Sequence, residues 1–464
     1  MNFVKILLWG YNGNMNNNLE NLKHYKTAIN GGGQVIILDT GAVIGPESAA
    51  MLQALHSRSI GGLESHLKIL AEKGSENFMK NFYVGYGHKS IGDCGSTSIF
   101  IEGVSILVAK AIQDWPLYSG QESSTRYIDF QIQPFKNPIE TKEGEEILEN
   151  WRKFYGESME PIKEHLKKRF IKEESELENI YNKAISARAF DILRGFLPAG
   201  VTTNLAWHTN LRQAADKIAI LRHSPIQEVK NVTKAIEETL KKAYPNSFNH
   251  EIFETTEEYN KYWMESDYYY HNPKCPDFEM TNNSVNVKLL KKDILEKRPM
   301  KTELPKYLSE AGPLQFEFLL DFGSFRDLQR HRSVTQRMPL LTTELGFENW
   351  YLEELPNGIK KKAEQLLKIQ TKKINKLKIS KEEKQYYIPM GYKISNRLTG
   401  GLPALVYIAE LRATRFVHPT LRKRAKQIAD KLSEIFDKFG LILHIDKEID
   451  RFDIKRGEHD IILK

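Results

Sequence analysis

The 464-residue sequence contains only two cysteines, Cys94 and Cys275, so a disulfide framework is excluded and a reducing cytoplasm is expected. No stretch of about eighteen consecutive apolar residues occurs, which argues against a membrane-spanning helix. The sequence also lacks the glycine-rich phosphate loops of nucleotide-binding folds. Its histidines His208, His331 and His418 do not have the spacing of zinc ligands, so no metal site is expected.

The chain has little net charge for its size. It carries 67 basic and 60 acidic residues, for a formal net charge of +7. An excess this small fits anionic small molecules at least as well as nucleic acid, and we expect a small-molecule partner and neither nucleic acid nor a membrane. The length exceeds that of one ordinary core, which favours two domains.

Hydrophobic periodicity predicts more helix than strand. Residues 47–80 and 144–190 have the spacing of amphipathic helices, whereas residues 98–112 combine β-branched residues with a helix-like end. Residues 258–284 lose the apolar period and contain Asn-Pro and Cys-Pro steps, which predicts a loop-rich domain boundary. The Lys-rich stretch 357–384 is best explained as a helix with a solvated face. The fold class predicted from this pattern is α+β.

Two segments of the chain repeat each other. Residues 196–222 read FLPAGVTTNLAWHTNLRQAADKIAILR, and residues 387–412 read YIPMGYKISNRLTGGLPALVYIAELR. Each begins with an apolar-Pro-x-Gly motif and ends with Ile-Ala-x-Leu-Arg, at Arg222 and Arg412. Two end motifs at nearly equal separation indicate one fold used twice.

Arg330, His331 and Arg332 follow an apolar segment that reads as buried, residues 313–323. Clustered cations beside such a segment suit a site where anions cover them, because an arginine pairs bidentately with phosphate or an anionic ring. An exposed loop, or an ion-pair cluster with nearby aspartates, is the structural alternative.

The first half has a polar motif at the corresponding place. Residues 119–127 read SGQESSTRY, in which Glu122, Ser124 and Arg126 alternate by two and would face one side of an extended segment. An acceptor, a hydroxyl and a cation could together hold a nucleotide's sugar and phosphate. A polar turn with capping serines is the alternative.

Together the two motifs resemble the signature of the flavin-dependent thymidylate synthases, ThyX. That signature runs Arg-His-Arg, then Ser, then Asn or Gln followed by Glu, then Ser, then Arg-Tyr. Residues 85–95, 186–198 and 210–212 resemble further segments of the family. The resemblance covers most of residues 40–250 and, more loosely, residues 311–437.

The resemblance implies two tandem ThyX-like units, residues 1–265 and 285–464, each a sheet flanked by helices. The signature is divided between them. The first unit has Asp114, Trp115 and Pro116 at the Arg-His-Arg positions, and the second unit lacks the later Ser, Glu and Arg. We therefore predict a composite site, with nucleotide-holding residues from the first unit and flavin-holding residues from the second. With two units per chain, a homodimer would replace the tetramer of the family.

The activity implied by the resemblance is reductive methylation of deoxyuridylate (dUMP) to thymidylate (dTMP). Methylenetetrahydrofolate would supply the carbon, FAD would carry the hydride and NADPH would reduce the flavin. Arg222 and Arg412 would pair with the pyrimidine ring and favour its ionisation at N3. The flavin-binding residues implied are His88, Ser90, Asn210, Arg212, Arg330, His331 and Arg332. The substrate-binding residues implied are Ser119, Gln121, Glu122, Ser124, Arg126 and Arg194.

Two alternatives stay open. The chain could be a non-catalytic ThyX paralogue that binds a nucleotide or flavin, or a flavoenzyme acting on another pyrimidine nucleotide. The divided signature favours the paralogue, as does the stretch TGGLPAL at 399–405, where the second unit lacks the Asn-Ala-Arg segment.

Overall fold

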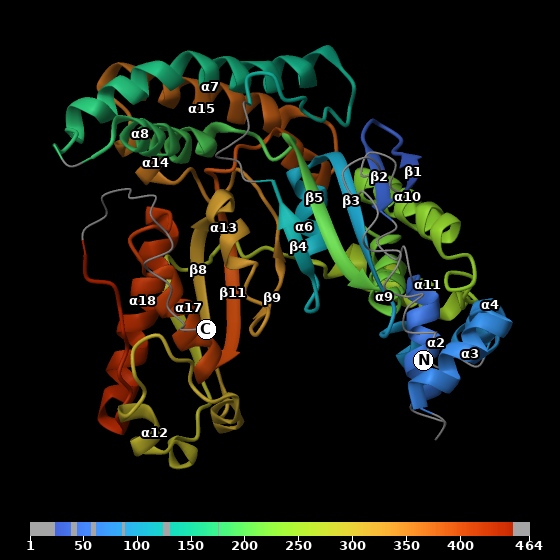
Figure 1. Cartoon of the computed structure of the whole chain (residues 1–464). Coiled ribbons are helices and arrows are strands. Elements are labelled where there is room, and N and C mark those ends of the chain that lie inside the picture. The colour runs from blue at the N-terminus through green and yellow to red at the C-terminus, as the bar shows by residue number, and fades with distance from the viewer. Residues whose placement is uncertain are drawn as a thin grey trace. The chain divides into compact units, whose positions relative to one another are not determined.

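The structure is a computed structural model and describes residues 24–38, 44–56, 62–85, 89–123, 130–174 and 176–448 (Figure 1). Contacts divide the described chain into two compact units. Unit one comprises residues between 24 and 104 together with 117–122 and 203–264, and unit two comprises 105–116, 123–202 and 265–448.

Unit one is built on a five-stranded sheet in the order β1-β2-β3-β5-β4. The strand β3 alternates along most of its length between buried and partly exposed residues, as expected for a sheet with one face on the core. The strands are β1 (His24–Ala28), β2 (Gln34–Leu38), β3 (Ser96–Ser105), β4 (Ser119–Glu122) and β5 (Thr202–Asn210).

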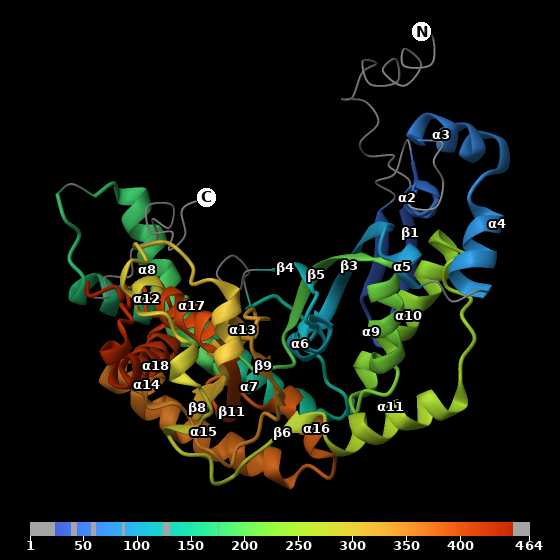
Figure 2. The ribbon, with the colours of Figure 1, turned by 90° about the horizontal axis from the view of Figure 1, so that it is seen from below.

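Helices cover this sheet. Figure 2 shows α10 beside β1, and α10 contacts both β1 and β2. The helices of unit one are α2 (Pro46–His56), α3 (Gly62–Lys73), α4 (Glu76–Phe78), a π-helix (Met79–Gly85), α5 (Lys89–Gly92), α9 (Leu211–Leu221), α10 (Gln227–Ala243) and α11 (Glu254–Ser266).

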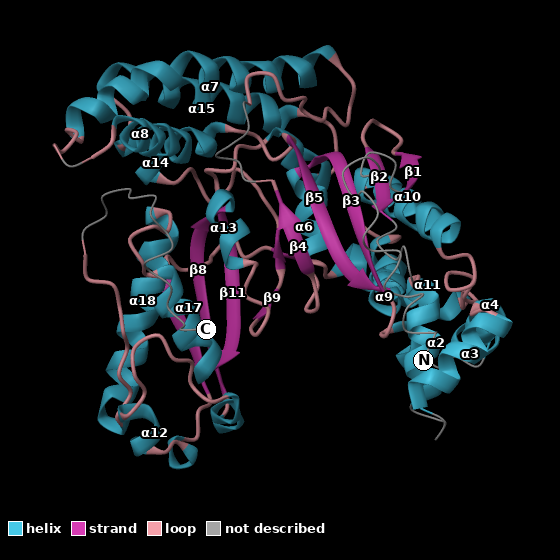
Figure 3. Ribbon diagram, in the orientation of Figure 1, coloured by secondary structure: helices cyan, strands magenta, loops and turns pink. Residues whose placement is uncertain are grey.

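Unit two has a four-stranded sheet in the order β7-β8-β11-β9, seen in magenta in Figure 3. Its centre is the antiparallel pair β8 and β11, which runs in register from Pro313 opposite Gly401 to Asp321 opposite Lys393. The strands are β7 (Phe278–Asn283), β8 (Pro313–Asp321), β9 (Thr335–Gln336) and β11 (Lys393–Gly401), and β6 (Tyr269–Tyr270) pairs separately with β10 (Met338–Pro339).

The helices of unit two pack on its strands and on one another. Helix α17 contacts β11, α18 contacts β8, and α7 runs beside α15 (Figure 1). The longer helices are α6 (Ile106–Gln113), α7 (Lys142–Arg169), α8 (Glu178–Leu193), α13 (Phe322–Leu328), α15 (Asn357–Lys376), α17 (Leu402–Arg412) and α18 (Pro419–Phe436). The shorter ones are α12 (Lys292–Glu296), α14 (Asn349–Glu353), α16 (Lys381–Lys384) and the 3₁₀ turns Arg194–Phe196, Val287–Leu289, Lys306–Ala311, Gln385–Tyr387 and Asp437–Phe439.

The order of elements in the first half recurs in the second. The series β3-α6-α7-β5-α9-α10 has the counterpart β8-α13-α15-β11-α17-α18, and the flanking strands β2 and β4 correspond to β7 and β9. The Lys-rich segment is helical as predicted, with a buried stripe of Ala363, Leu367, Gln370 and Ile374. The predicted α+β class is confirmed.

The two apolar-Pro-x-Gly motifs lie against each other. Pro198 and Pro389 form an antiparallel bridge. The N–H of Ala199 donates to the carbonyl of Ile388 at 3.0 Å, and the N–H of Met390 donates to the carbonyl of Leu197 at 2.9 Å. A second, outer pair of bonds runs from Gly200 to Tyr386 and from Gly391 to Gly195. Each bond has a mate in the other motif, so the ladder has two-fold symmetry.

The compact units differ from the division between residues 265 and 285 that the sequence predicted. Helices α6, α7 and α8 precede residue 265, yet contacts place them in unit two with the second half. The reason is that α7 packs on its counterpart α15, where Gln370 Nε2 donates to the carbonyl of Ile147 at 2.8 Å.

One sequence prediction is corrected in part. The stretch 258–284, expected to be loop-rich, begins as helix, because α11 continues to Ser266. Met264 is its only buried residue, so the helix has a narrow apolar face and a weak apolar period. Residues 1–18, MNFVKILLWGYNGNMNNN, have the pattern of a first strand followed by a polar loop, and they lie outside the described residues.

We predict that Gly391→Ala destabilises the protein by about 1–3 kcal/mol, the usual cost of overpacking. A Cβ at Gly391 would lie 2.7 Å from the carbonyl oxygen of Gly195 and 2.5 Å from the Phe347 ring, and backbone in the ladder has little room to yield. Chemical denaturation measures the difference. Gly358→Ala is the matched control, since nothing lies within 4 Å of its added Cβ. Equal stability of the two variants would contradict the tight ladder.

Candidate active site

The Arg-His-Arg loop, residues 330–332, follows the end of α13. Its N-terminal anchor is Asp321, whose Oδ2 accepts from the N–H of Ser324 at 2.8 Å and caps the helix. Arg330 and Arg332 are exposed, whereas His331 between them is buried. The loop therefore presents two cations to solvent and turns its imidazole inward.

His331, which the resemblance assigned to the flavin, and Arg412, which it assigned to the pyrimidine ring, are in contact. Nε of Arg412 donates to Nε2 of His331 at 2.7 Å, and Nη2 of Arg412 donates to the carbonyl of Asp327 at 2.8 Å. Because Arg412 only donates, Nε2 of His331 is the unprotonated nitrogen and Nδ1 carries the proton. Burial and then the charge of Arg412 lower the pKa of His331 well below its usual value, so the ring is neutral.

Asp327 balances these cations. Burial would raise the pKa of its carboxyl group, but Arg412, Arg330, Arg194 and Arg326 together lower it to about 2. Oδ1 of Asp327 lies 3.6 Å from Nε of Arg330. The carboxylate is ionised at every physiological pH and holds the arginines near the loop.

A pocket of about 280 Å³ opens beside the loop. One wall comes from the second half and the other from the end of α6 in the first half. Counted from the helix caps Ser105 and Asp321, the residues Asp114-Trp115-Pro116 occupy the positions of the Arg-His-Arg loop. The lining residues are Gln113, Asp114, Trp115, Pro116, Phe325, Gln329, His331, Arg332, Ser333, Val334, Thr335, Gln336 and Arg337.

Arg194, predicted to bind substrate, is buried in a polar network. Its Nη2 donates to Oγ of Ser324 at 3.1 Å. Asp321 at the centre accepts from the Tyr351 hydroxyl at 2.7 Å and from Thr420 at 2.5 Å. Oγ1 of Thr420 also lies 2.8 Å from Nδ1 of His418. In this arrangement Arg194 joins elements of the two halves.

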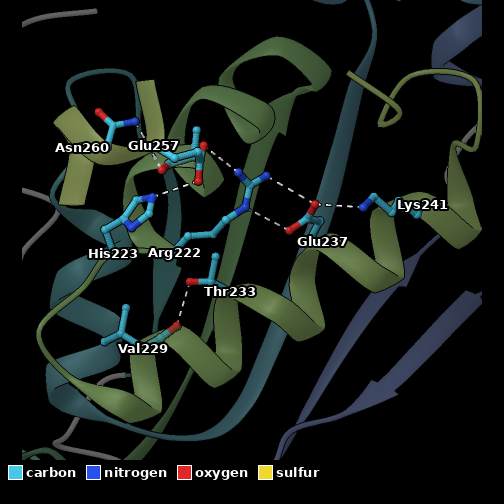
Figure 4. Close-up of polar contacts among 9 residues, drawn as sticks. Arg222, His223, Val229, Thr233, Glu237, Lys241, Glu257 and Asn260 are labelled. Carbon is cyan, nitrogen blue, oxygen red and sulfur yellow. Dashed lines mark hydrogen bonds and ion pairs between the residues drawn. The ribbon is translucent and has the colours of Figure 1, made fainter. Parts of the chain in front are cut away.

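Arg222 lies in an ion-pair network in unit one (Figure 4). Its guanidinium donates to Glu237 at 3.2 and 3.3 Å and to Glu257 at 3.0 Å. Glu257 also pairs with His223 at 2.9 Å, and Glu237 with Lys241 at 2.9 Å. Glu237 and Glu257 therefore accept from Nε, Nη1 and Nη2 of Arg222, the guanidinium group that the resemblance would pair with a pyrimidine ring.

Arg222 and Arg412 are also offset by one residue. Asn210 caps α9 and Gly401 caps α17, and both helices have 11 residues. Arg412 is the last residue of α17, whereas Arg222 is the residue after α9. One residue rotates a side chain by about 100° around a helix. Relative to the sheet of its own half, each arginine side chain therefore points in a different direction.

The other first-half residues lie in unit one. Asn210 accepts from the N–H of Gln213 at 2.8 Å as a helix cap, and Arg212 pairs with Asp93 at 2.8 Å. Ser90 is exposed in α5. On β4, Ser119 and Gln121 are exposed and Glu122 is half-buried. The predicted residues His88, Ser124 and Arg126 lie outside the described residues, so the composite site stays a prediction.

The sequence did not single out Gln329 or the segment Asp114-Trp115-Pro116 as residues that line one pocket with the Arg-His-Arg loop. Gln329 directly precedes the Arg-His-Arg motif but is not part of it. The segment Asp114-Trp115-Pro116 differs from that motif at all three positions. The signal that could have found the segment is the spacing from Ser105 and Asp321, which places the two loops at the same helix end.

Within the described ranges no group of three or more His, Cys, Asp or Glu side chains could hold a metal ion. No helix in the same ranges is long and apolar enough to cross a membrane.

Residues 45–246 match the family model described as thymidylate synthase complementing protein, Thy1. The match covers 202 of the 464 residues of the chain. The chain is also similar to UPF0159 proteins of Chlamydia pneumoniae (25% identical over 441 residues, 82% of each chain) and Chlamydia muridarum (24% over 430 residues, 79% of this chain and 80% of the relative). A UPF0159 protein of Thermoplasma acidophilum is 22% identical over 451 residues, covering 81% of this chain and 90% of the relative. These alignments extend over both halves of the chain. The match of residues 45–246 to the Thy1 model confirms the resemblance to the ThyX family that the motifs indicated.

We predict that His331 makes stability fall with acid. The unfolded histidine binds a proton near pH 6.5 and the folded one does not, so stability is complete above that pH and falls as pH decreases below it, by about 1.4 kcal/mol at pH 5.5. Denaturation of the wild type and His331→Gln between pH 7.5 and 5.5 measures this difference. The variant should lose less stability than the wild type, and parallel pH profiles would show that the folded ring takes up its proton normally.

We predict that Arg222→Met destabilises unit one by about 1–3 kcal/mol, because it leaves Glu237 and Glu257 without their shared cation. Burial opposes ionisation of Glu237, but Lys241 and Arg222 outweigh it and lower its pKa. The stabilisation is thus present above the unfolded pKa of about 4.3 and is lost as pH falls through the folded pKa. Denaturation at pH 7 and pH 4 tests this, and the loss should be smaller at pH 4. The control Lys241→Met should cost less, since that lysine is 45% exposed.

Proposed function

We propose that this chain is a ThyX-like, flavin-dependent thymidylate synthase that converts dUMP to dTMP. Methylenetetrahydrofolate would supply a methylene group, and NADPH would supply the reducing hydride. The uracil C5–H bond is replaced by a bond to the new methyl carbon, and the C5 hydrogen leaves as a proton. The observation that supports this best is the contact between His331 and Arg412, residues 81 positions apart that the resemblance assigned to the flavin and to the pyrimidine ring.

The residues of the loop fit part of a flavin dinucleotide. Arg330 and Arg332 are exposed cations suited to a pyrophosphate, and Trp115 and Phe325 line the adjoining pocket. A volume of about 280 Å³ holds a ring with part of its substituent and not a whole dinucleotide. When bound, the flavin supplies the hydride-transfer chemistry.

The protein's own contribution is binding and orientation. Arg330 and Arg332 would pair with phosphate. His331, neutral and protonated at Nδ1, would donate one hydrogen bond, and Arg412 would fix its tautomer and ring orientation. Arg412 is in this view a positioning residue, since its Nε and Nη2 are already engaged by the protein.

A second candidate is a ThyX paralogue that binds a flavin or nucleotide without synthase activity. The observation favouring it is Arg222, whose guanidinium is occupied by Glu237 and Glu257 and so is not presented to a pyrimidine. A flavoenzyme acting on another pyrimidine nucleotide would need the same flavin-binding loop.

We also propose a homodimer of chains. The symmetric ladder between the two Pro-x-Gly motifs supports this, because it makes one chain resemble a fused pair of subunits.

Tritium release tests the proposed function. Purified protein with FAD, NADPH, methylenetetrahydrofolate and dUMP labelled at C5 should release tritium to water and form dTMP, and omission of any one component should abolish both. The double variant Arg330→Ala/Arg332→Ala should weaken FAD binding roughly ten- to hundredfold, as expected for loss of charge-assisted bonds. The control Lys361→Ala/Lys372→Ala removes two exposed charges from α15 and should bind FAD normally. Full flavin occupancy without tritium release would favour the paralogue.

A further inference from the structure

Helix α11 in unit one exposes large apolar side chains. Met264 is the only buried residue of the helix, and Tyr259 and Tyr262 are 67% and 72% exposed. Ile252 and Phe253, which directly precede the helix, are also more than half exposed. Large apolar side chains that gather on one exposed segment mark a surface that a partner covers.

Carboxylates run along the same helix. Glu254, Glu258 and Glu265 lie within about 40° of one another around the axis, at about 100° per residue. All three are exposed, and none forms an ion pair within the described ranges. Tyr262 lies about 40° from Glu258 on the same scale, so the acidic row borders an exposed aromatic ring.

An open groove in unit two has the opposite charge. Its volume is about 660 Å³, and helix α15, with seven lysines and one glutamate, contributes to its lining. Phe347, Leu367 and Tyr392 provide apolar surface in the groove. The lysines that line it are Lys368, Lys372 and Lys376.

These three lysines form a row without counterions from the protein. They follow one another at intervals of four residues, about 6 Å along the helix. All are exposed, and none forms an ion pair in the part of the chain that the structure describes. By contrast, Lys373 on the same helix pairs with Glu146 at 2.7 Å. A cationic row beside apolar surface suits a partner helix that presents carboxylates beside apolar side chains.

We propose that α11 of a second copy of this chain docks in the α15 groove, with its glutamates against the lysine row and its tyrosines on the apolar lining. The charges are complementary, and on both surfaces apolar groups border the charged row. A two-fold dimer would contain the contact twice, since each copy offers one helix and one groove. Both helices lie outside residues 45–246, the part that matches the family model. The inference rests on the proposed homodimer and is independent of the proposed chemistry.

Charge reversal on either surface tests the contact. The groove variant is Lys368→Glu/Lys372→Glu, and the helix variant is Glu254→Lys/Glu258→Lys. Each variant places like charges opposite one another, so the dimer Kd of the full-length chain, measured by sedimentation, should rise about tenfold or more. Because the substituted side chains are exposed, each variant should fold normally, which circular dichroism checks.

A control variant separates this contact from a general effect of charge. Lys288→Glu/Lys306→Glu changes the net charge by the same amount as the groove variant, at exposed lysines of unit two that do not line the groove. It should dimerise like the wild type.

Mixing the two variants tests whether these two surfaces meet each other. In a mixed dimer the unchanged α11 of the groove variant meets the unchanged groove of the helix variant, and the reversed helix meets the reversed groove. Both contacts are then complementary. An equimolar mixture should therefore regain dimers at concentrations where each variant alone stays dissociated.

Each outcome decides the inference. Loss of the dimer in both variants and its return on mixing support it. A variant that dimerises like the wild type overturns it and leaves the homodimer intact, and folded variants that stay apart on mixing overturn the pairing of these two surfaces. A wild type that is monomeric at every concentration overturns both this contact and the homodimer. Tritium release by the same wild-type preparation tests the proposed chemistry separately.

Discussion

The antiparallel ladder between residues 195–200 and 386–391 is the interaction on which the rest of unit two depends. Its backbone hydrogen bonds relate the two motifs by a two-fold operation and fix their register against each other. The glycine that ends each motif allows this approach, because a Cβ on Gly200 would lie 2.6 Å from the carbonyl oxygen of Tyr386. Counterpart helices then meet, as α7 meets α15.

The same symmetry brings unlike residues together. The ends of α6 and α13 occupy equivalent positions, yet one carries Asp-Trp-Pro and the other Arg-His-Arg, and both line one pocket. Arg194 crosses between the halves in a similar way to meet Ser324. A symmetric framework thus supports an asymmetric site, with cations on one wall and an aromatic ring with acceptors on the other.

Sequence patterns predicted the parts that local periodicity and repetition determine. The α+β class, the Lys-rich helix and the strand-to-helix change near residue 105 follow from side-chain spacing. The hydrogen bond between His331 and Arg412 was not predicted, because the resemblance assigned the histidine to the flavin and the arginine to the pyrimidine ring. The carboxylates around Arg222 could not be predicted, because Glu237 and Glu257 meet it only through tertiary packing. The one-residue offset can be read in the repeat, because Arg222 lies 24 residues after Pro198 and Arg412 lies 23 residues after Pro389.

A fused pair of halves changes how sequence variation acts near the symmetry axis. In a dimer of identical subunits, every substitution occurs twice, so a tryptophan gained on one side of the axis is also gained on the other. In this chain Trp115 and His331 are encoded separately, and each could change without altering its counterpart. Covalent fusion therefore permits a division of labour across the axis that a symmetric assembly forbids.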